Sequence, residues 1–219
     1  QVLVENQILP KKISDLYDDL IDSSYQKISS KGQKVIYQAL IISYNGHDGQ
    51  IRKSGEPYIY HPIAVARICA DEMTLGPTSV ICALLHDTVE DTHITLSDIE
   101  DLFGKEVRLI IDGLTKIPEV FDDNASIQAE NFRKMLLTLH DDIRVIIIKI
   151  ADRLHNMETI HSMPENKQLK IASETLYIYA PLAHKIGLYN IKTKLEDLAL
   201  KYTEPEVYND ISLKLEESK

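Results

Sequence analysis

The sequence predicts an all-α protein, and three observations support this fold class. Glycine and proline are sparse, with 8 residues of each in a chain of 219. Segments with apolar residues spaced three and four positions apart recur from one end of the chain to the other. Hydrophobic residues make up 44% of the sequence, enough for one large domain or for one domain with an extension.

The N-terminal part predicts three amphipathic helices. The apolar spacing places them over 13–28, over 35–44 with Gly46 closing the helix, and over 61–74. The segment 49–57 between the last two is polar and rich in turn-forming residues, so we expect a loop there.

A helix carrying His86 and Asp87 is expected next. Gly76-Pro77 breaks the chain, and Thr78 or Ser79 is expected to cap the helix that follows. Further along, the sequence 97–100 (Ser-Asp-Ile-Glu) has the form of a capping box and predicts a short helix that ends at Gly104.

The second half of the chain continues the helical pattern. Helices are predicted over 105–116, 127–139, 143–159, from Pro164 with a kink at Pro181, and over 191–215 with an interruption near Pro205. The acidic segment 118–126 is expected to be a loop. The β-branched run from Ile143 is compatible with a buried strand, but its continuation at helical spacing favours a deeply buried helix.

Composition excludes several classes of function. A formal net charge of −10 argues against a general nucleic-acid-binding protein. No run of about 18 apolar residues occurs, so we expect no membrane partner and no transmembrane helix. The N-terminus lacks the pattern of a secretory signal. Cys69 and Cys82 fit small buried side chains in a reducing compartment, so the expected location is cytoplasmic.

The most informative stretch is the adjacent pair His86-Asp87 within an apolar segment. A buried imidazole and a buried carboxylate are costly without a partner, and a divalent metal ion removes that cost. His61 and Asp152 likewise stand at the start of or within apolar helices. Singly, each residue is compatible with an ordinary hydrogen bond, a cap or an ion pair. Together, His61, His86, Asp87 and Asp152 predict a metal site in the core of a helical bundle, with ligands suited to manganese, iron or zinc.

Other polar residues lie close to these ligands along the chain. Glu90 and Asp91 follow the His-Asp pair by three to four residues and are expected on the same helical face, where a carboxylate can orient a water molecule or accept its proton. The remaining candidates are expected to bind substrate: Arg52, Lys53 and Ser54 in the loop before His61, and Asn156 and Thr159 one and two turns after Asp152. His155 and the other histidines, at 47, 93, 140, 161 and 184, are interpreted as structural.

Four blocks of sequence resemble the RelA/SpoT homologues, in the N-terminal HD hydrolase domain of that family. These are the blocks 52–62, 85–92, 128–135 and 151–157, and the resemblance covers about residues 30 to 200. It implies a helical HD fold and a manganese-dependent hydrolase that converts (p)ppGpp into GDP or GTP and pyrophosphate, with other divalent metals also possible.

By motif matching, the resemblance implies roles for individual residues. His61, His86, Asp87 and Asp152 would hold the metal, and Glu90 and Asp91 would match the catalytic pair. Arg52, Lys53 and Ser54 would bind guanine and phosphate, while Tyr58, Asn156 and Thr159 would match nucleotide-contacting positions.

The resemblance also has departures and rivals. Glu158 stands where many relatives have a basic residue, and the segment from Leu182 resembles the lead-in to a synthetase domain. We therefore expect a hydrolase domain over 1–195 and a helical extension over 196–219 towards synthetase and regulatory domains of a longer protein. The alternatives are an HD phosphohydrolase acting on another nucleotide and a module that binds nucleotide without cleaving it.

Overall fold

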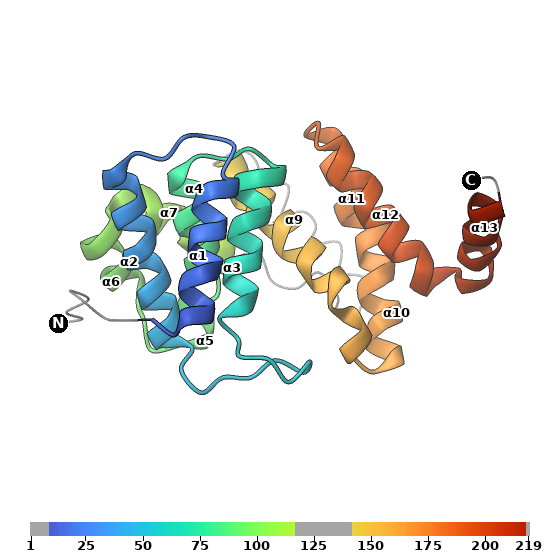
Figure 1. Ribbon diagram of the computed structural model, residues 1–219, viewed down its shortest axis with the longest axis horizontal. Helices are drawn as coiled ribbons and strands as arrows, with labels where there is room; N and C mark the ends of the chain where they lie inside the picture. The colour runs from blue at the N-terminus through green and yellow to red at the C-terminus, as the bar shows by residue number, and fades with distance from the viewer. Residues whose placement is uncertain (1–8, 117–141, 218–219) are drawn as a thin grey trace. The chain divides into compact units, whose positions relative to one another are not determined.

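The protein is helical throughout the described part of the chain. The computed structural model describes residues 9–116 and 142–217 (Figure 1). Its α-helices are α1 Lys11–Ser23, α2 Ser30–Gly46, α3 Tyr60–Arg67, α4 Pro77–Leu85, α5 Thr88–Asp91, α6 Leu96–Phe103, α7 Lys105–Thr115, α9 Ile143–Glu158, α10 Glu165–Glu174, α11 Ala180–Lys185, α12 Tyr189–Thr203 and α13 Pro205–Glu217. Short turns of other helix types are η1 Ile68–Glu72, η2 Ile160–Ser162 and η3 Thr175–Tyr179. Within these ranges no strand forms, and the all-α prediction is confirmed.

Residues group into two compact units, Gln1–Ala151 and Asp152–Lys219. The division falls inside α9, so this helix begins in the first unit and ends in the second. The loop and the helix predicted for 118–126 and 127–139 lie outside the described residues, as does the sequence block 128–135.

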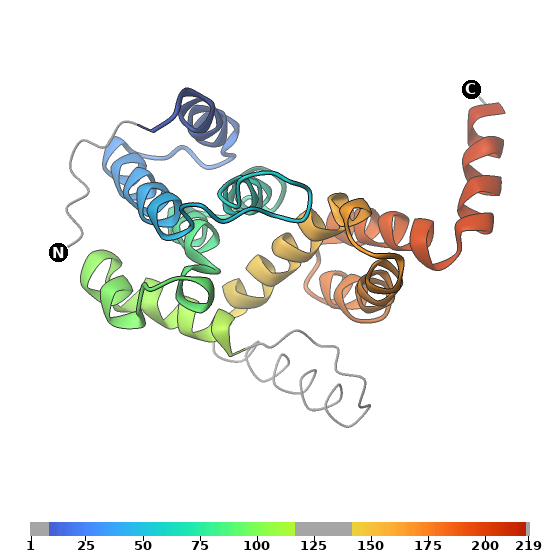
Figure 2. The same ribbon diagram turned by 90° about the horizontal axis from the view of Figure 1, so that it is seen from below.

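The first unit is built around α4. Every residue of this helix from Ser79 to Leu85 is buried, which is typical of a helix covered on all sides. Helix α4 packs against α2, α3 and α7. Figure 2 shows α6 and α7 side by side as the outer layer of this unit. Cys69 and Cys82 are both buried and are not joined by a disulfide, in agreement with the sequence prediction of small buried side chains.

The second unit is a smaller helical cluster. Its apolar centre combines Met157 and Ile160 with Ala172 and Ala199 of α10 and α12. The helical run that contains Pro181 changes to a π-helical turn over Thr175–Tyr179 and resumes as α11 at Ala180. Pro181 lacks a backbone N–H, and the π-helical turn directly before it interrupts the regular helix. The kink predicted at Pro181 stays a prediction.

The apolar run from Ile143 is helical, as predicted. In α9 the side chains of Val145, Ile146, Ile148 and Ile150 are all buried. The interruption near Pro205 is also confirmed, because α12 ends at Thr203 and α13 begins at Pro205. No helix among the described residues combines the length and apolar character that a bilayer crossing requires.

The first helix is shorter than the sequence predicts. It ends at Ser23 instead of near residue 28. The hydroxyls of Ser23 and Ser24 donate to the carbonyl oxygen of Leu20, and serine side chains that bond to the backbone in this way compete with helix continuation. The next amide, that of Tyr25, donates instead to the carbonyl of Ala70.

Two predicted helix caps are wrong. Neither Thr78 nor Ser79 caps α4, because Gly76 is the N-cap residue and Pro77 takes the first helical position that suits proline. The capping box expected from Ser97 is formed by Thr95 and Asp98 instead. The Asp98 amide donates to Oγ1 of Thr95, and Oδ2 of Asp98 accepts from the Thr95 amide, so α6 starts at Leu96. The predicted end at Gly104 is confirmed.

Candidate metal centre

His61 enters the first unit at the start of α3. Its amide donates to the carbonyl of Tyr58 in the turn that leads out of the polar loop. The imidazole is 2% exposed and lies against α4, since α3 and α4 pack together. The sequence prediction that His61 lies at the start of a helix is confirmed.

His86 and Asp87 do not lie within one helix, which corrects the sequence prediction. Helix α4 ends at Leu85, and the pair forms the turn before α5 begins at Thr88. The Thr88 hydroxyl donates to the Leu85 carbonyl over 2.7 Å, which ends the α4 pattern. The backbone of Asp87, at φ −101° and ψ −5°, then redirects the chain.

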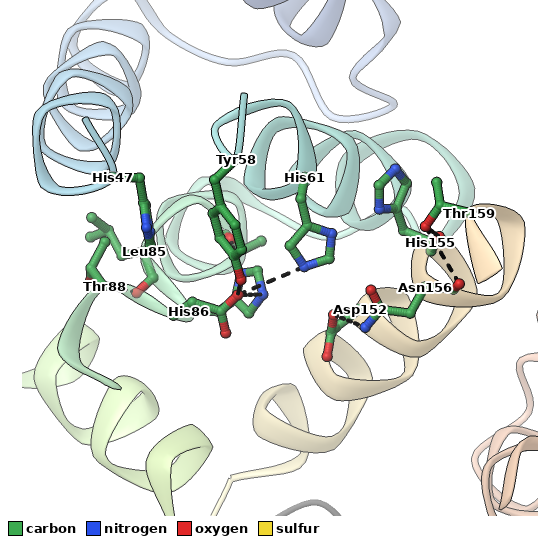
Figure 3. A network of polar contacts seen from close by, with 12 residues as sticks. His47, Tyr58, His61, Leu85, His86, Thr88, Asp152, His155, Asn156 and Thr159 are labelled. Carbon is green, nitrogen blue, oxygen red and sulfur yellow. Dashed lines mark hydrogen bonds and ion pairs between the residues drawn. The ribbon is translucent and has the colours of Figure 1, made fainter. Parts of the chain in front are cut away.

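The turn brings the two side chains together. Oδ2 of Asp87 lies 2.9 Å from Nε2 of His86 and 3.7 Å from Nε2 of His61. The Tyr58 hydroxyl donates to the same Oδ2 over 2.5 Å. Figure 3 shows the side chains of Tyr58, His61 and His86 pointing toward one another. The predicted proximity of His61 to the His-Asp pair is therefore present in the structure.

Electrostatics favour an ionised Asp87. Burial is the largest single effect and raises the pKa of its carboxyl group, but the charge and hydrogen bond of His86, the charge of His61 and the hydrogen bond from the Tyr58 hydroxyl together outweigh it. The net result is a pKa well below the usual range of an aspartate. The group is therefore an anionic oxygen donor held between two imidazoles.

The donor set fits a divalent cation. Nδ1 of His86 lies 2.7 Å from the carbonyl oxygen of Ala83, and this carbonyl can only accept a hydrogen bond. Nδ1 therefore carries the hydrogen, and in the neutral ring the lone pair of Nε2 faces the Asp87 carboxylate. Two electron pairs 2.9 Å apart repel each other, so this close approach calls for a proton or a cation between the two atoms. A backbone carbonyl that fixes the tautomer of a histidine is a usual support of a metal ligand.

Asp152 is carried by α9, one residue beyond Ala151. Its carboxylate, His61 and His86 each offer a ligand atom, and these three atoms lie within 4.8 Å of one another. Asn156 donates from Nδ2 to Oδ1 of Asp152 over 2.8 Å and so orients the carboxylate. The mixed set of imidazole nitrogens and carboxylate oxygens suits manganese, iron or zinc.

Glu90 and Asp91 lie on α5, a single turn after the His-Asp pair. The helix break at the pair means that they do not share a continuous helical face with it, which corrects that expectation. The carboxylates are nevertheless close in the chain to Asp87, whose carbonyl accepts from the Asp91 amide over 2.9 Å. Partial burial raises the pKa of Glu90; the nearby Lys149 lowers it, and Asp87 and Asp91 add to the increase.

The loop with Arg52, Lys53 and Ser54 forms a tight turn in front of Tyr58. The Arg52 amide donates to the carbonyl of Glu56, and the isolated bridge between Ile51 and Pro57 closes the base of the turn. Gly55 at its tip has φ 86°, a left-handed value that suits glycine. Lys53 and Ser54 are exposed and Arg52 is half-buried.

The positions after Asp152 differ in their hydrogen bonding. Asn156 contacts Asp152, as described above. The Thr159 hydroxyl donates to the carbonyl of His155 over 3.0 Å, within its own helical turn. Glu158 is exposed at the end of α9.

Sequence reasoning missed His47 and Gln50. His47 is buried at the end of α2, and its ring stacks on Tyr58 with centroids 4.6 Å apart. Gln50 connects His47 to the backbone of Asp91. The available signal was the position of both residues directly before the Arg52 loop.

Comparisons with known proteins place these features in a family. The family model described as "HD domain" matches residues 39–189, well over half of the chain. The bifunctional (p)ppGpp synthase/hydrolase SpoT of Escherichia coli strain K12 is 49% identical over 179 residues, covering 81% of this chain and 25% of that protein. A GTP pyrophosphokinase of Myxococcus xanthus is 48% identical over 190 residues, covering 84% of this chain and 25% of that protein. The chain thus spans about a quarter of the length of these relatives.

A solved structure supports the fold. The study that describes it is titled "A metazoan ortholog of SpoT hydrolyzes ppGpp and plays a role in starvation responses". It superimposes with a TM-score of 0.58 at 24% identity and covers 75% of this chain and 93% of that one. The resemblance to RelA/SpoT homologues is confirmed by these matches. Since the family match takes in α3, the α4–α5 turn and α9 together, the chain belongs to the HD-domain family.

Proposed function

We propose that this chain is a metal-dependent (p)ppGpp 3′-pyrophosphohydrolase, which converts ppGpp into GDP and pppGpp into GTP with release of pyrophosphate. The observation that carries the proposal is the convergence of His61 and His86 on the ionised carboxylate of Asp87. Relatives named for (p)ppGpp hydrolysis share nearly half of their aligned residues with this chain, which supports the choice of substrate.

The proposed ligands of the metal are His61, His86, Asp87 and Asp152, and the proposed metal is Mn²⁺. When bound, such an ion acts as a Lewis acid towards water and phosphate oxygens. The chain's own contribution is to fix the ligand atoms: Ala83 orients His86 through its carbonyl, and Asn156 orients Asp152.

Glu90 and Asp91 are the proposed catalytic carboxylates. They follow Asp87 by one turn, and the role we assign to them is to orient the attacking water and to accept its proton. Water replaces the 3′ ribose oxygen at the phosphorus, so that pyrophosphate leaves and the 3′ hydroxyl is regenerated. The raised pKa of Glu90 brings this group closer to neutral pH, which suits a residue that takes up and returns a proton.

The remaining candidates are proposed to bind the nucleotide. The guanidinium of Arg52 stacks on the guanine, and the ammonium of Lys53 offsets phosphate charge with help from the Ser54 hydroxyl. Contacts with the nucleotide on the side that faces the proposed metal ion are assigned to Tyr58, Asn156 and Thr159. The Thr159 hydroxyl donates to the His155 carbonyl, and a hydroxyl oxygen is also able to accept a hydrogen bond, for example from a ribose hydroxyl.

The organisation of the chain is also part of the proposal. We assign the hydrolase domain to 1–195 and a helical extension to 196–219, which leads towards synthetase and regulatory domains of a longer protein, with a cytoplasmic location. The exposed apolar residues of α13, such as Ile211 and Leu215, fit an extension whose packing partner is another part of that protein.

The test is to incubate the purified chain with ppGpp and Mn²⁺ and to separate the products by anion-exchange chromatography. We expect GDP and pyrophosphate in equal amounts, with no turnover after chelation of the metal. Because one relative is named as a GTP pyrophosphokinase, a parallel reaction with GTP and ATP measures synthesis.

The matched variants are Asp152→Ala and Glu90→Gln. Asp152→Ala is expected to lose both metal and turnover, whereas Glu90→Gln is expected to keep the metal and lose turnover. A folded, metal-loaded wild-type chain that leaves ppGpp intact contradicts the proposal. Cleavage of other nucleotides in a substrate panel then identifies another HD phosphohydrolase, and tight ppGpp binding without cleavage identifies a binding module.

A further inference from the structure

His47 packs against Tyr58, a neighbour of the proposed metal ligand Asp87. The residue follows the last turn of α2 and its side chain is 3% exposed. Its imidazole stacks on the ring of Tyr58, with an interplanar angle of 28° (Figure 3). Tyr58 in turn donates its hydroxyl hydrogen to Asp87. One face of the histidine therefore supports the tyrosine that holds a proposed metal ligand.

The edge of the His47 ring is connected to α5, the helix that carries Glu90 and Asp91. Nδ1 of His47 lies 2.8 Å from Oε1 of Gln50, and Nε2 of Gln50 donates to the carbonyl oxygen of Asp91 over 2.9 Å. The Asp91 carbonyl can only accept, so it fixes the orientation of the Gln50 amide. Oε1 therefore faces His47, and Nδ1 must carry the hydrogen. This pair of bonds runs from the end of α2 to the end of α5.

The backbone couples the same residues. The Gln50 amide donates to the carbonyl of His47, and the Tyr58 amide donates to the carbonyl of Gln50. Hydrogen bonds and ring stacking thus connect His47, Gln50 and Tyr58 into one cluster at the base of the Arg52 loop.

The other ring nitrogen of His47 makes an imidazole energetically unfavourable at this position. Nε2 of His47 is buried and has no hydrogen-bond partner among the described residues. An unpaired buried nitrogen is unfavourable, and a phenylalanine ring would fill the same space without that cost. The imidazole is therefore not explained by packing, and within the described part of the chain its one hydrogen bond is the bond to Gln50.

We propose that His47 is a positioning residue for the hydrolase site. The face of its ring holds Tyr58 against Asp87, and its Nδ1–H, acting through the Gln50 amide, holds the Asp91 end of α5. This inference rests on the proposed function, which assigns the metal to Asp87 and water activation to Glu90 and Asp91.

Two substitutions separate the two contacts. His47→Phe keeps an aromatic ring on Tyr58 and removes the donor to Gln50. His47→Asn keeps an N–H donor near the position of Nδ1 and removes the stacked ring. The Mn²⁺ affinity of each metal-free variant is measured by isothermal titration calorimetry, and kcat and KM are measured with ppGpp. Hydrogen exchange of the amides of Asp91 and Thr92 reports on the end of α5 without requiring turnover.

The expected results differ between the variants. His47→Phe lowers kcat about tenfold and speeds amide exchange in α5, with KM and Mn²⁺ affinity close to wild type. His47→Asn lowers Mn²⁺ affinity about tenfold and leaves amide exchange close to wild type. The exposed His161 gives the matched control, and His161→Phe is expected to leave Mn²⁺ affinity and amide exchange unchanged.

The outcomes decide between positioning and packing. Wild-type values in both variants overturn the proposal. Equal losses of metal affinity, turnover and thermal stability in both also overturn it, because they indicate a ring that only fills space. If the wild type does not cleave ppGpp, the proposed function fails, and Mn²⁺ affinity with amide exchange still decides the role of His47. If either variant does not fold, Gln50→Met on the half-buried Gln50 tests the contact to Asp91 by the same exchange measurement.

Discussion

The hydroxyl of Tyr58 donates to Oδ2 of Asp87, the same oxygen that lies nearest to the imidazoles of His61 and His86. The tyrosine comes from the end of the polar loop, and the aspartate comes from the turn between α4 and α5. This bond therefore joins the loop proposed to bind nucleotide to the centre proposed to bind metal.

Removing that hydroxyl tests the link. Tyr58→Phe keeps the ring and its stacking on His47 but leaves Oδ2 of Asp87 without its donor. We expect Mn²⁺ affinity to fall about tenfold, as is typical when a supporting hydrogen bond to a metal ligand is lost. Calorimetric titration of the metal-free protein measures the change, and Tyr177→Phe, at an exposed tyrosine, is the control. Unchanged affinity would mean that the bond does not support a ligand.

Metal removal should lower thermal stability. A ligand that binds only the folded chain adds about 2.7 kcal/mol at a free concentration roughly 100 times its Kd. For a chain of this size, that corresponds to roughly 5 to 10 °C in Tm. Calorimetric melting with and without Mn²⁺ measures the shift, and Asp152→Asn should abolish most of it. A wild-type Tm that is indifferent to Mn²⁺ would count against a metal site built from these residues.

Glu90 should set the acidic limit of turnover. Burial raises its pKa, so the side chain stays protonated to a higher pH than a free glutamic acid, and a protonated carboxyl group cannot accept a proton from water. The rate is therefore expected to rise with pH through a value above about 4.3, the pKa of an unperturbed glutamate. Glu90→Gln should lower kcat at least about a hundredfold and flatten this limb.

The matched substitution is Glu100→Gln, on the exposed face of α6. It is expected to leave both the rate and the pH profile as they are in wild type. An acidic limb that persists unchanged in Glu90→Gln would assign it to a different group.

A buried ion pair next to Asp152 should stabilise the second unit. Arg153 and Glu174 are both buried, their charged atoms lie 2.6 Å apart, and the guanidinium also packs over the ring of Tyr179. Arg153→Met leaves the Glu174 carboxylate buried without its cation, which should lower the free energy of unfolding by about 3 to 5 kcal/mol. Denaturant unfolding measures this loss, and the double variant with Glu174→Leu should recover most of it. No recovery would show that the arginine acts by packing.

Much of the fold follows from periodicity, and what escaped prediction depends on single side-chain bonds. The helix from Ile143 was distinguishable from a strand because its apolar spacing continues past Ala151. The end of α4 at Leu85 could not be predicted from the sequence. It depends on a hydrogen bond from the Thr88 hydroxyl, which a pattern of apolar residues does not reveal. Serine hydroxyls end α1 early in the same way.

The residues of the candidate site also differ in whether the sequence alone identifies them. Buried polar residues in apolar segments identified His61 and the His86-Asp87 pair, since such residues need a partner wherever they lie. A lone histidine at a helix end carries no distinguishing pattern, so the sequence gives no reason to include His47 in the site. Its contacts with Tyr58 and Gln50 arise only when the chain turns back on itself after Gly49, which has φ 73°.

The turn at His86 and Asp87 limits how this pair can be transplanted. Neighbouring residues of a regular helix point about 100° apart, so an uninterrupted helix with the same two letters would send its imidazole and carboxylate in different directions. If the dipeptide alone is copied into a helical scaffold, only one of its two side chains should reach the metal, and the other should remain an unpaired polar group. The segment to transfer is 83–88. The Ala83 carbonyl orients the imidazole of His86, and the Thr88 hydroxyl stabilises the turn.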